Sequence, residues 1–431
     1  MKQTLLVIPH EFNGIPVFGL GWLLALWLIW SSGYLFWLWR RQGWNRDTAS
    51  YLPTMLVGAG AILWMLPWLE ASTGDGNLQG LAIRGYGMMF LLAVVSGVGL
   101  TLLMARRAGI HPDVIFSMSF WCFVFGIIGA RMFFVIQYWH EFYNPLQPPD
   151  LITLVSKILK FTEGGLVVYG SLIGAMLAYL MVLHRRQLPK LATLDLFVPG
   201  LAIGLAFGRL GCLLNGCCWG GVCEDNSAGI HFPAGAPPYM AQLHSGQLLG
   251  IELERTEGQF IGSVASIKPG SLADRKGVAV GDRITQLVSL SSHQLRNKSS
   301  SPTRVAVTLR RDQKPELLWT LNQLPPSSLG VVPTQILSSL NAALICLLAW
   351  VWYPVRRRDG ELVAGMFTIY PVTRFLLEII RSDEPGRWGT ALTMSQWVSI
   401  LMLLVAVLLW ARILSRPPQR ALPAPQSEQK T

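Results

Sequence analysis

Long apolar runs separated by short polar loops make up most of this chain. Nine of them can be read as spans, because a helix that crosses a bilayer needs about 20 mainly apolar residues. They lie at about residues 15–39, 54–70, 83–104, 113–138, 164–184, 194–215, 334–353, 361–381 and 392–413. The pattern predicts an all-α polytopic membrane protein with about nine transmembrane helices and one polar insertion between the sixth and seventh.

Four polar residues share one side of the eighth predicted helix. They are Tyr370, Arg374, Glu378 and Arg381. Their spacing of three or four positions places them within an arc of roughly 80° on the helix. A charged residue inside a membrane costs about 2.5 to 3.5 kcal/mol and usually faces a protein interior or a wet cavity. A structural Arg–Glu pair between two helices is the alternative, but two arginines face one glutamate, which favours a functional site.

Composition and charge agree with a membrane protein. The chain is 52% hydrophobic and 14% charged, and its net charge is +11. The basic residues lie mostly in short alternate loops, so they set topology and do not indicate nucleic acid. By the positive-inside rule, the N-terminus and the 216–333 segment are expected outside and the C-terminus inside.

Several predicted helices carry polar residues at one depth, in the outer half of the membrane. These residues are Arg84, Tyr86, Arg131, Tyr169, Arg209, Asn215, Gln335, Arg374, Glu378 and Arg381. Arginine dominates, and its planar fork suits phosphate, so an anionic lipid head group is the expected ligand. For Arg84 and Arg381 the alternative is a side chain that reaches to the membrane interface.

The most specific patterns are glycine-rich stretches at 163–175 and 206–221, where small residues allow close approach of a backbone or a ligand. Residues 208–217, with Arg209 and Asn215, are similar to the signature Gly-Arg-Ile-Gly-Asn-Phe-x-Asn-Gly-Glu of the prolipoprotein diacylglyceryl transferase family. Further matches to that family follow in order along the chain, at 83–90, 129–134, 333–335, 374–381 and 392–399. The resemblance covers the last seven predicted helices.

This resemblance implies a reaction and a site. The family transfers diacylglycerol from phosphatidylglycerol to the lipobox cysteine of preprolipoproteins in the bacterial inner membrane, and no cofactor or metal is expected. The implied catalytic residues are Arg209, Arg374, Tyr169 and Glu378. The implied substrate-binding residues are Arg84, Tyr86, Arg131, Gly170, Asn215, Gly220, Gln335, Tyr370 and Arg381.

The chain departs from the family where a proton must be removed. Tyr169 stands where the family commonly has a histidine that is proposed as the general base. The thiol proton is then left to Tyr169, to Glu378 or to the phosphate itself. An inactive homologue that binds phospholipid or lipoprotein is the alternative function. An intramembrane metalloprotease is excluded, because His10 and Glu11 lack the second histidine of a zinc-binding motif.

Cysteines cluster after the sixth predicted helix, at Cys212, Cys217, Cys218 and Cys223. On the outer side of the membrane a disulfide is expected, in which Cys212 or Cys223 pairs with one of the two adjacent thiols. Zinc is the weaker interpretation, because the spacing fits no common knuckle. Cys122 and Cys346 are expected to be packing residues.

The insertion at 224–332 has a core that resembles a PDZ domain of the bacterial protease-associated kind. The match lies in 258–287 and 303–311, so a small, mostly β, extracytoplasmic PDZ-like core is expected at about 258–325. Such domains bind an extended peptide at a sheet edge. An inert spacer is the alternative.

The predicted organisation has five parts. They are two additional N-terminal helices at 1–82, a transferase-like core at 83–223 and 333–415, the insertion, and a disordered cytoplasmic tail at 416–431.

Overall fold

The computed structural model describes residues 4–43, 46–68, 70–72, 78–143, 150–159, 167–223, 229–253, 262–290, 295, 305–312, 314–381, 386 and 389–422. Within these residues, eight helices are long and apolar enough to cross a membrane. They are α1 (Trp22–Gln42), α4 (Gly85–Arg107), α5 (Pro112–Gln137), α8 (Val168–Arg186), α9 (Lys190–Asn215), α12 (Thr334–Trp352), α13 (Glu361–Ile379) and α14 (Met394–Leu414). The prediction of a polytopic, mainly helical membrane protein is confirmed. Most of the predicted disordered tail, 423–431, lies outside the described residues.

The second predicted span differs from the other eight. It falls on three consecutive helical pieces, α2 (Arg46–Gly60), η1 (Ala61–Met65) and α3 (Leu66–Trp68). Their apolar part, Tyr51–Met65, is shorter than the eight long helices.

The N-terminal unit, Met1–Met89, also contains strands that the hydrophobic pattern did not predict. In it, β1 (Thr4–Ile8) pairs antiparallel with β5 (Leu78–Arg84), and β4 (Ala71–Ser72) lies on the other side of β5. A short hairpin joins β2 (Glu11–Phe12) to β3 (Ile15–Pro16). This unit is therefore a helix pair with a small sheet.

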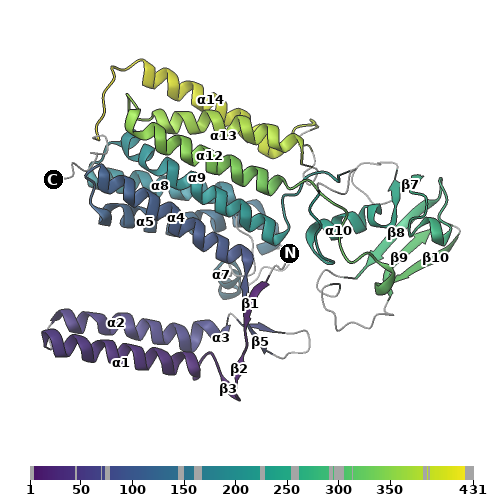
Figure 1. Cartoon of the computed structure of the whole chain (residues 1–431), viewed down its shortest axis with the longest axis horizontal. Helices are drawn as coiled ribbons and strands as arrows, with labels where there is room; N and C mark the ends of the chain where they lie inside the picture. The colour runs from purple at the N-terminus through teal and green to yellow at the C-terminus, as the bar shows by residue number, and fades with distance from the viewer. Residues whose placement is uncertain are drawn as a thin grey trace. The chain divides into compact units, whose positions relative to one another are not determined.

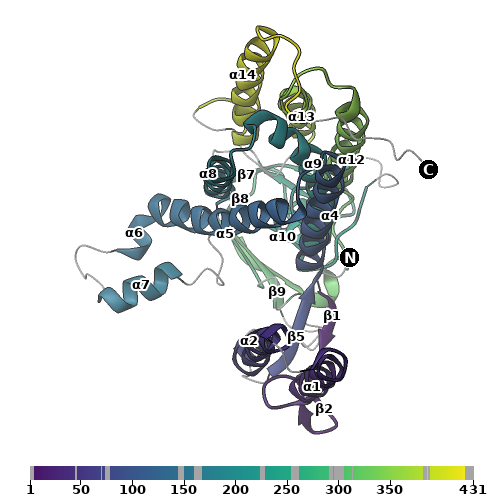
Figure 2. The same cartoon turned by 90° about the vertical axis from the view of Figure 1, so that its left-hand side faces the viewer.

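The second unit, Phe90–Thr431, holds the other membrane helices. Helix α5 packs along α8, while α9 packs along α12, and α13 lies between α12 and α14 (Figure 1). Two short helices, α6 (Trp139–Phe142) and α7 (Leu151–Leu159), follow α5 and are set apart from the main bundle (Figure 2). The bundle places α9, α12 and α13 next to one another.

A buried carboxylate fixes the start of α13 against α9. Asp195 is fully buried and accepts hydrogen bonds from the backbone N–H groups of Gly360, at 2.7 Å, and Val363, at 3.1 Å. The first N–H groups of a helix lack partners inside it, so a carboxylate satisfies them and favours the positive end of the helix dipole. Arg356, also fully buried, lies 3.7 Å from Asp195. The register between the two helices is thereby set at this end.

Glycines allow α5 and α8 to approach closely. A Cβ added to Gly170 would lie 2.3 Å from the Gly129 carbonyl oxygen, and one added to Gly174 would lie 2.0 Å from the Phe125 carbonyl oxygen. Both neighbours are backbone atoms of α5, which cannot move aside independently. Gly170 was expected to bind substrate, and in the structure it is a packing residue between two helices.

The insertion folds as a five-stranded antiparallel sheet in the order β10-β9-β8-β7-β6. The strands are β6 (Ile251–Leu253), β7 (Gly262–Ile267), β8 (Arg283–Ser289), β9 (Val305–Arg311) and β10 (Lys314–Thr320), and α10 (Pro237–His244) precedes them. Trp319, Leu309 and Leu243 are fully buried in its core. Sheet and core therefore begin before residue 258, the predicted start of the PDZ-like core.

We expect Gly170→Ala to destabilise the protein, because the new methyl group would meet the Gly129 carbonyl and force the helices apart. Overpacking of this kind typically costs about 1 to 3 kcal/mol. The measurement is the thermal unfolding midpoint of the full-length protein in detergent. Gly99→Ala is the matched control, since nothing lies within 4 Å of a Cβ at this helical glycine. Equal midpoints for the two variants would contradict the packing role.

Candidate functional site

The polar side of α13 is an ion-pair cluster. The Glu378 carboxylate lies 2.7 Å from an Arg374 nitrogen and 2.9 Å from an Arg381 nitrogen. The Glu378 side chain is fully buried, and the two arginine side chains are mostly buried. One carboxylate thus pairs with two guanidinium groups, that of Arg374 within α13 and that of Arg381 two residues beyond its end.

The start of α14 completes this cluster. Thr393 caps α14 in a reciprocal arrangement with Gln396, and its hydroxyl donates to the Glu378 carboxylate at 3.1 Å. Arg374 donates to the hydroxyl of Ser395 at 2.9 Å. Sequence reasoning gave no role to Thr393 or Ser395, although both lie in the stretch 392–399. The Thr-x-x-Gln capping pattern was the signal that could have placed Thr393 at a helix start.

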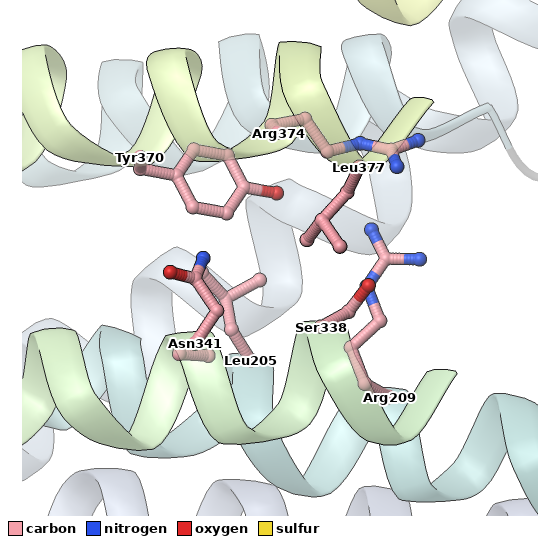
Figure 3. A pocket seen from close by; sticks show the side chains of 8 residues that line it. Leu205, Arg209, Ser338, Asn341, Tyr370, Arg374 and Leu377 are labelled. Atoms are coloured by element: carbon pink, nitrogen blue, oxygen red, sulfur yellow. The ribbon is translucent and has the colours of Figure 1, made fainter. Parts of the chain in front are cut away.

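A pocket between α9, α12 and α13 opens beside this cluster (Figure 3). It is lined by Leu205, Arg209, Ser338, Asn341, Ala342, Tyr370, Arg374 and Leu377. Figure 3 shows Arg209 and Arg374 extending toward each other from opposite sides, with the Tyr370 hydroxyl pointing to the same space. Its volume is about 10 Å³, roughly the space of one water molecule. A larger ligand would need the side chains to separate or would occupy the pocket from its open side.

The charges of the pocket favour an anion. Arg209 interacts with the Tyr370 hydroxyl, and its positive charge also repels that of Arg374. Among the ion pairs of the described residues, none joins Arg209 to an acid. Arg374 and Arg381 therefore share the carboxylate of Glu378, and Arg209 adds a third positive charge close to Arg374. A phosphate would relieve this repulsion and accept hydrogen bonds from two planar forks.

The turn after α9 is tied to both neighbouring helices. The carbonyl of Cys217 accepts from the Gln335 amide at 2.8 Å, and that of Cys218 accepts from the Thr334 hydroxyl at 2.7 Å. Gly220 bridges to Arg381, and a Cβ there would lie 2.8 Å from the Cβ of Val332. Gln335 and Gly220, expected to bind substrate, thus hold this turn in place.

The remaining predicted residues lie elsewhere. Arg131 donates two hydrogen bonds of 2.8 Å to the carbonyls of Ile158 and Lys157, so it fastens the end of α7 to α5. Tyr169 is in the first turn of α8, has 38% of its surface exposed and does not line the pocket described above. Asn215 is the last residue of α9.

Arg84 and Tyr86 belong to the N-terminal unit, at the end of β5 and the start of α4. Within that unit, Arg84 pairs with Thr4 of β1.

The cysteines are close together but are not joined. The Sγ atoms of Cys212, Cys217 and Cys218 all lie within 4.8 Å of one another. All six cysteines of the chain are free thiols in the structure, so the predicted disulfide is not present. Cys346 is buried and Cys122 is partly buried, in keeping with packing roles.

The fold and the site define a multi-pass membrane protein with a basic pocket among its helices. A family model described as prolipoprotein diacylglyceryl transferase matches residues 76–412. The chain belongs to this family, and the resemblance read from its motifs is confirmed.

Individual relatives support the assignment. The phosphatidylglycerol–prolipoprotein diacylglyceryl transferase of Rhodopirellula baltica is 37% identical to this chain. The alignment covers 94% of this chain and 87% of the relative. The enzyme named phosphatidylglycerol–prolipoprotein diacylglyceryl transferase 2 from Clostridium perfringens is 25% identical, covering 78% of this chain and 93% of the relative. Similarity to the Rhodopirellula protein thus extends well beyond the shared membrane core.

Proposed function

We propose that this chain transfers the diacylglyceryl group of phosphatidylglycerol to the lipobox cysteine of preprolipoproteins in the bacterial inner membrane. The observation that carries this proposal is the pair Arg209 and Arg374, which face one pocket from two helices (Figure 3). The family membership supports it, since relatives along most of the chain are named for this reaction.

The reaction needs a site that stabilises a leaving phosphate. The cysteine sulfur attacks the glycerol carbon of the lipid and forms a C–S bond, while the C–O bond to phosphate breaks and glycerol phosphate leaves with the electron pair. Negative charge grows on the phosphate during this step. Arg209 and Arg374 would hold that phosphate, and fixed positive groups stabilise such charge most where water is scarce.

Glu378 fits a positioning role better than that of a base. Its carboxylate already accepts from Arg374, Arg381 and Thr393. A general base must reach the proton that it removes, and these partners occupy the Glu378 oxygens. The candidates that remain within this chain and its substrate are Tyr169 and the phosphate.

Arg209→Lys keeps the charge but removes the planar fork. We expect transfer to fall by at least tenfold while the protein still inserts, because a lysine cannot bind phosphate in the bidentate manner. The assay is lipoprotein modification in membranes that lack the endogenous transferase. Arg310→Lys is the control, since Arg310 is an exposed residue of the inserted sheet. Equal transfer by wild type and Arg209→Lys would reject the phosphate clamp.

In the same assay, Tyr169→Phe separates the two proton acceptors. It should strongly slow transfer if the phenol carries the thiol proton and do little if the phosphate accepts it. Lipid binding without transfer by the wild-type protein would favour the alternative, a non-catalytic binder.

We propose that the N-terminus lies outside and the C-terminus inside, as the alternation of basic loops suggests. Reporter fusions at residues 187 and 357 should then score cytoplasmic, and one at 290 extracytoplasmic. If residue 290 is cytoplasmic, the pocket lies in the wrong leaflet for secreted substrates.

We propose that the insertion is a PDZ-like module that binds an extended peptide. In support, β6 is an edge strand of the sheet, and it follows a tight loop in which Gly246 and Gly250 have positive φ angles. An edge strand offers backbone groups that a peptide can pair with. Next to the core, the buried Asp282 carboxylate pairs with Arg311 at 3.0 Å and with the half-exposed Lys314. Burial alone would raise the pKa of Asp282, but hydrogen bonds from Lys314, a backbone amide and Arg311 lower it overall.

Replacing residues 234–326, which include α10 and the whole core of the insertion, by a short Gly/Ser linker should leave phosphatidylglycerol binding unchanged and reduce the modification of some or all lipoproteins. The reason is that the pocket residues all lie outside the removed segment. Lipid binding to the purified protein and lipoprotein modification in membranes are the two measurements. If lipid binding is lost as well, the insertion belongs to the lipid site.

A further inference from the structure

Three thiols meet at the end of α9, next to the phosphate pocket. Cys212 lies in the last turn of α9, one helical turn beyond Arg209, and Cys217 and Cys218 lie in the turn that follows. Their Sγ atoms lie within 4.8 Å of one another, and all three residues are partly buried. None of the steps proposed above uses them.

The backbone holds this arrangement firmly. Gly216 ends α9 at a φ of 78°, and the N–H of Cys217 then returns to the Cys212 carbonyl at 3.1 Å. Cys218 has a φ of 61°, a conformation uncommon for a residue with a side chain. The hydrogen bonds from Gln335 and Thr334 to the two cysteine carbonyls fix the turn from α12. The thiols therefore converge without any change in the backbone.

The distances between the three sulfur atoms suit a zinc ion. Zinc binds thiolate sulfur at about 2.3 Å in a tetrahedron, which separates two sulfurs by about 3.8 Å. A set of sulfurs within 4.8 Å of one another needs only small side-chain rotations to reach this distance. Three protein ligands and one open position are the arrangement of catalytic zinc sites, whereas structural sites are closed by four.

The surrounding charge suits it as well. A zinc ion with three thiolates carries a net charge of −1. Arg209 and Arg381 both lie close enough to Cys218 to interact with it electrostatically. Nearby guanidinium groups would balance the charge of the filled site.

We propose that Cys212, Cys217 and Cys218 bind one Zn²⁺ ion whose fourth position takes the thiol of the substrate cysteine. This inference rests on the proposed transferase function. Tyr169 replaces the family histidine, so the loss of the proton from the substrate thiol needs another explanation. A zinc ion would provide one. A thiol that coordinates zinc is deprotonated outright, so no strong base is needed in the protein.

The step then balances as follows. The substrate thiol binds zinc and releases its proton to water. The zinc-bound sulfur gives an electron pair to the glycerol carbon, the C–S bond forms, and the C–O bond breaks. Glycerol phosphate leaves with the bond's electron pair between Arg209 and Arg374, and the thioether, a weaker ligand, leaves the metal.

Metal content is the first test. The full-length protein, purified in detergent under reducing conditions and given Zn²⁺ before desalting, should hold about one zinc per chain by elemental analysis. Cys212→Ser, Cys217→Ser and Cys218→Ser should each lower the retained zinc by at least tenfold. Cys223→Ser is the matched control and should retain it, because Cys223 is free and outside the trio. A variant could also lose zinc because it misfolds. The wild-type protein therefore provides a second test: a chelator should remove its zinc, and added Zn²⁺ should restore it.

The open position is tested with Co²⁺ in place of zinc. A lipobox peptide with its cysteine should change the visible spectrum of the cobalt protein, and the same peptide with serine should not. Any of three results would overturn the inference. The wild-type protein could hold no more zinc than the triple serine variant, the trio could form a disulfide in the intact protein, or the two peptides could give identical spectra.

The two proposals fail separately. Normal transfer by the zinc-free serine variants would sink the metal site and leave the transferase standing. Zinc and peptide binding without transfer by wild type would sink the transferase and leave the metal site.

Discussion

The buried carboxylate of Glu378 is the interaction on which the candidate site depends. The guanidinium groups of Arg374 and Arg381 lie close together and would repel each other strongly in a membrane, and Glu378 lies within 2.9 Å of both. Removing one partner of a buried ion pair typically costs about 3 to 5 kcal/mol, because it leaves an uncompensated charge. Since Thr393 binds the same carboxylate, Glu378 also fixes where α14 starts relative to α13.

A second buried acid acts at the other end of α13. Asp195 of α9 binds the N–H groups that open this helix, and Glu378 lies near its last turn. The helix is thus held at both ends by buried carboxylates, and between them Thr368 accepts a hydrogen bond from Trp410 and Thr373 accepts one from Asn341. This arrangement places Arg374 opposite Arg209 with little freedom to drift, which is the condition for two side chains to bind one phosphate group.

The sequence predicted the parts of this molecule that obey simple periodicity. Apolar runs located the eight long helices, and the spacing of Arg374, Glu378 and Arg381 predicted that they lie close together. It could not predict which polar residues bind one another. Arg131 uses its fork on carbonyls of α7, and Gln335 holds a turn. These contacts depend on tertiary structure, as does the pairing of β1 with β5 across about 70 residues of intervening chain.

The inserted domain leaves and re-enters the membrane core at two points that are paired with each other. Val222 and Val331 form a bridge, and the backbone N–H of Cys223 donates to the Gly330 carbonyl at 2.8 Å. Because the two ends of the insertion lie side by side, the membrane core does not have to change its structure to accommodate it. Chains tolerate the gain or loss of a domain at such sites. The transferase-like core could therefore acquire or discard this module during evolution without rebuilding its helices, so substrate choice could diversify while the lipid chemistry stayed constant.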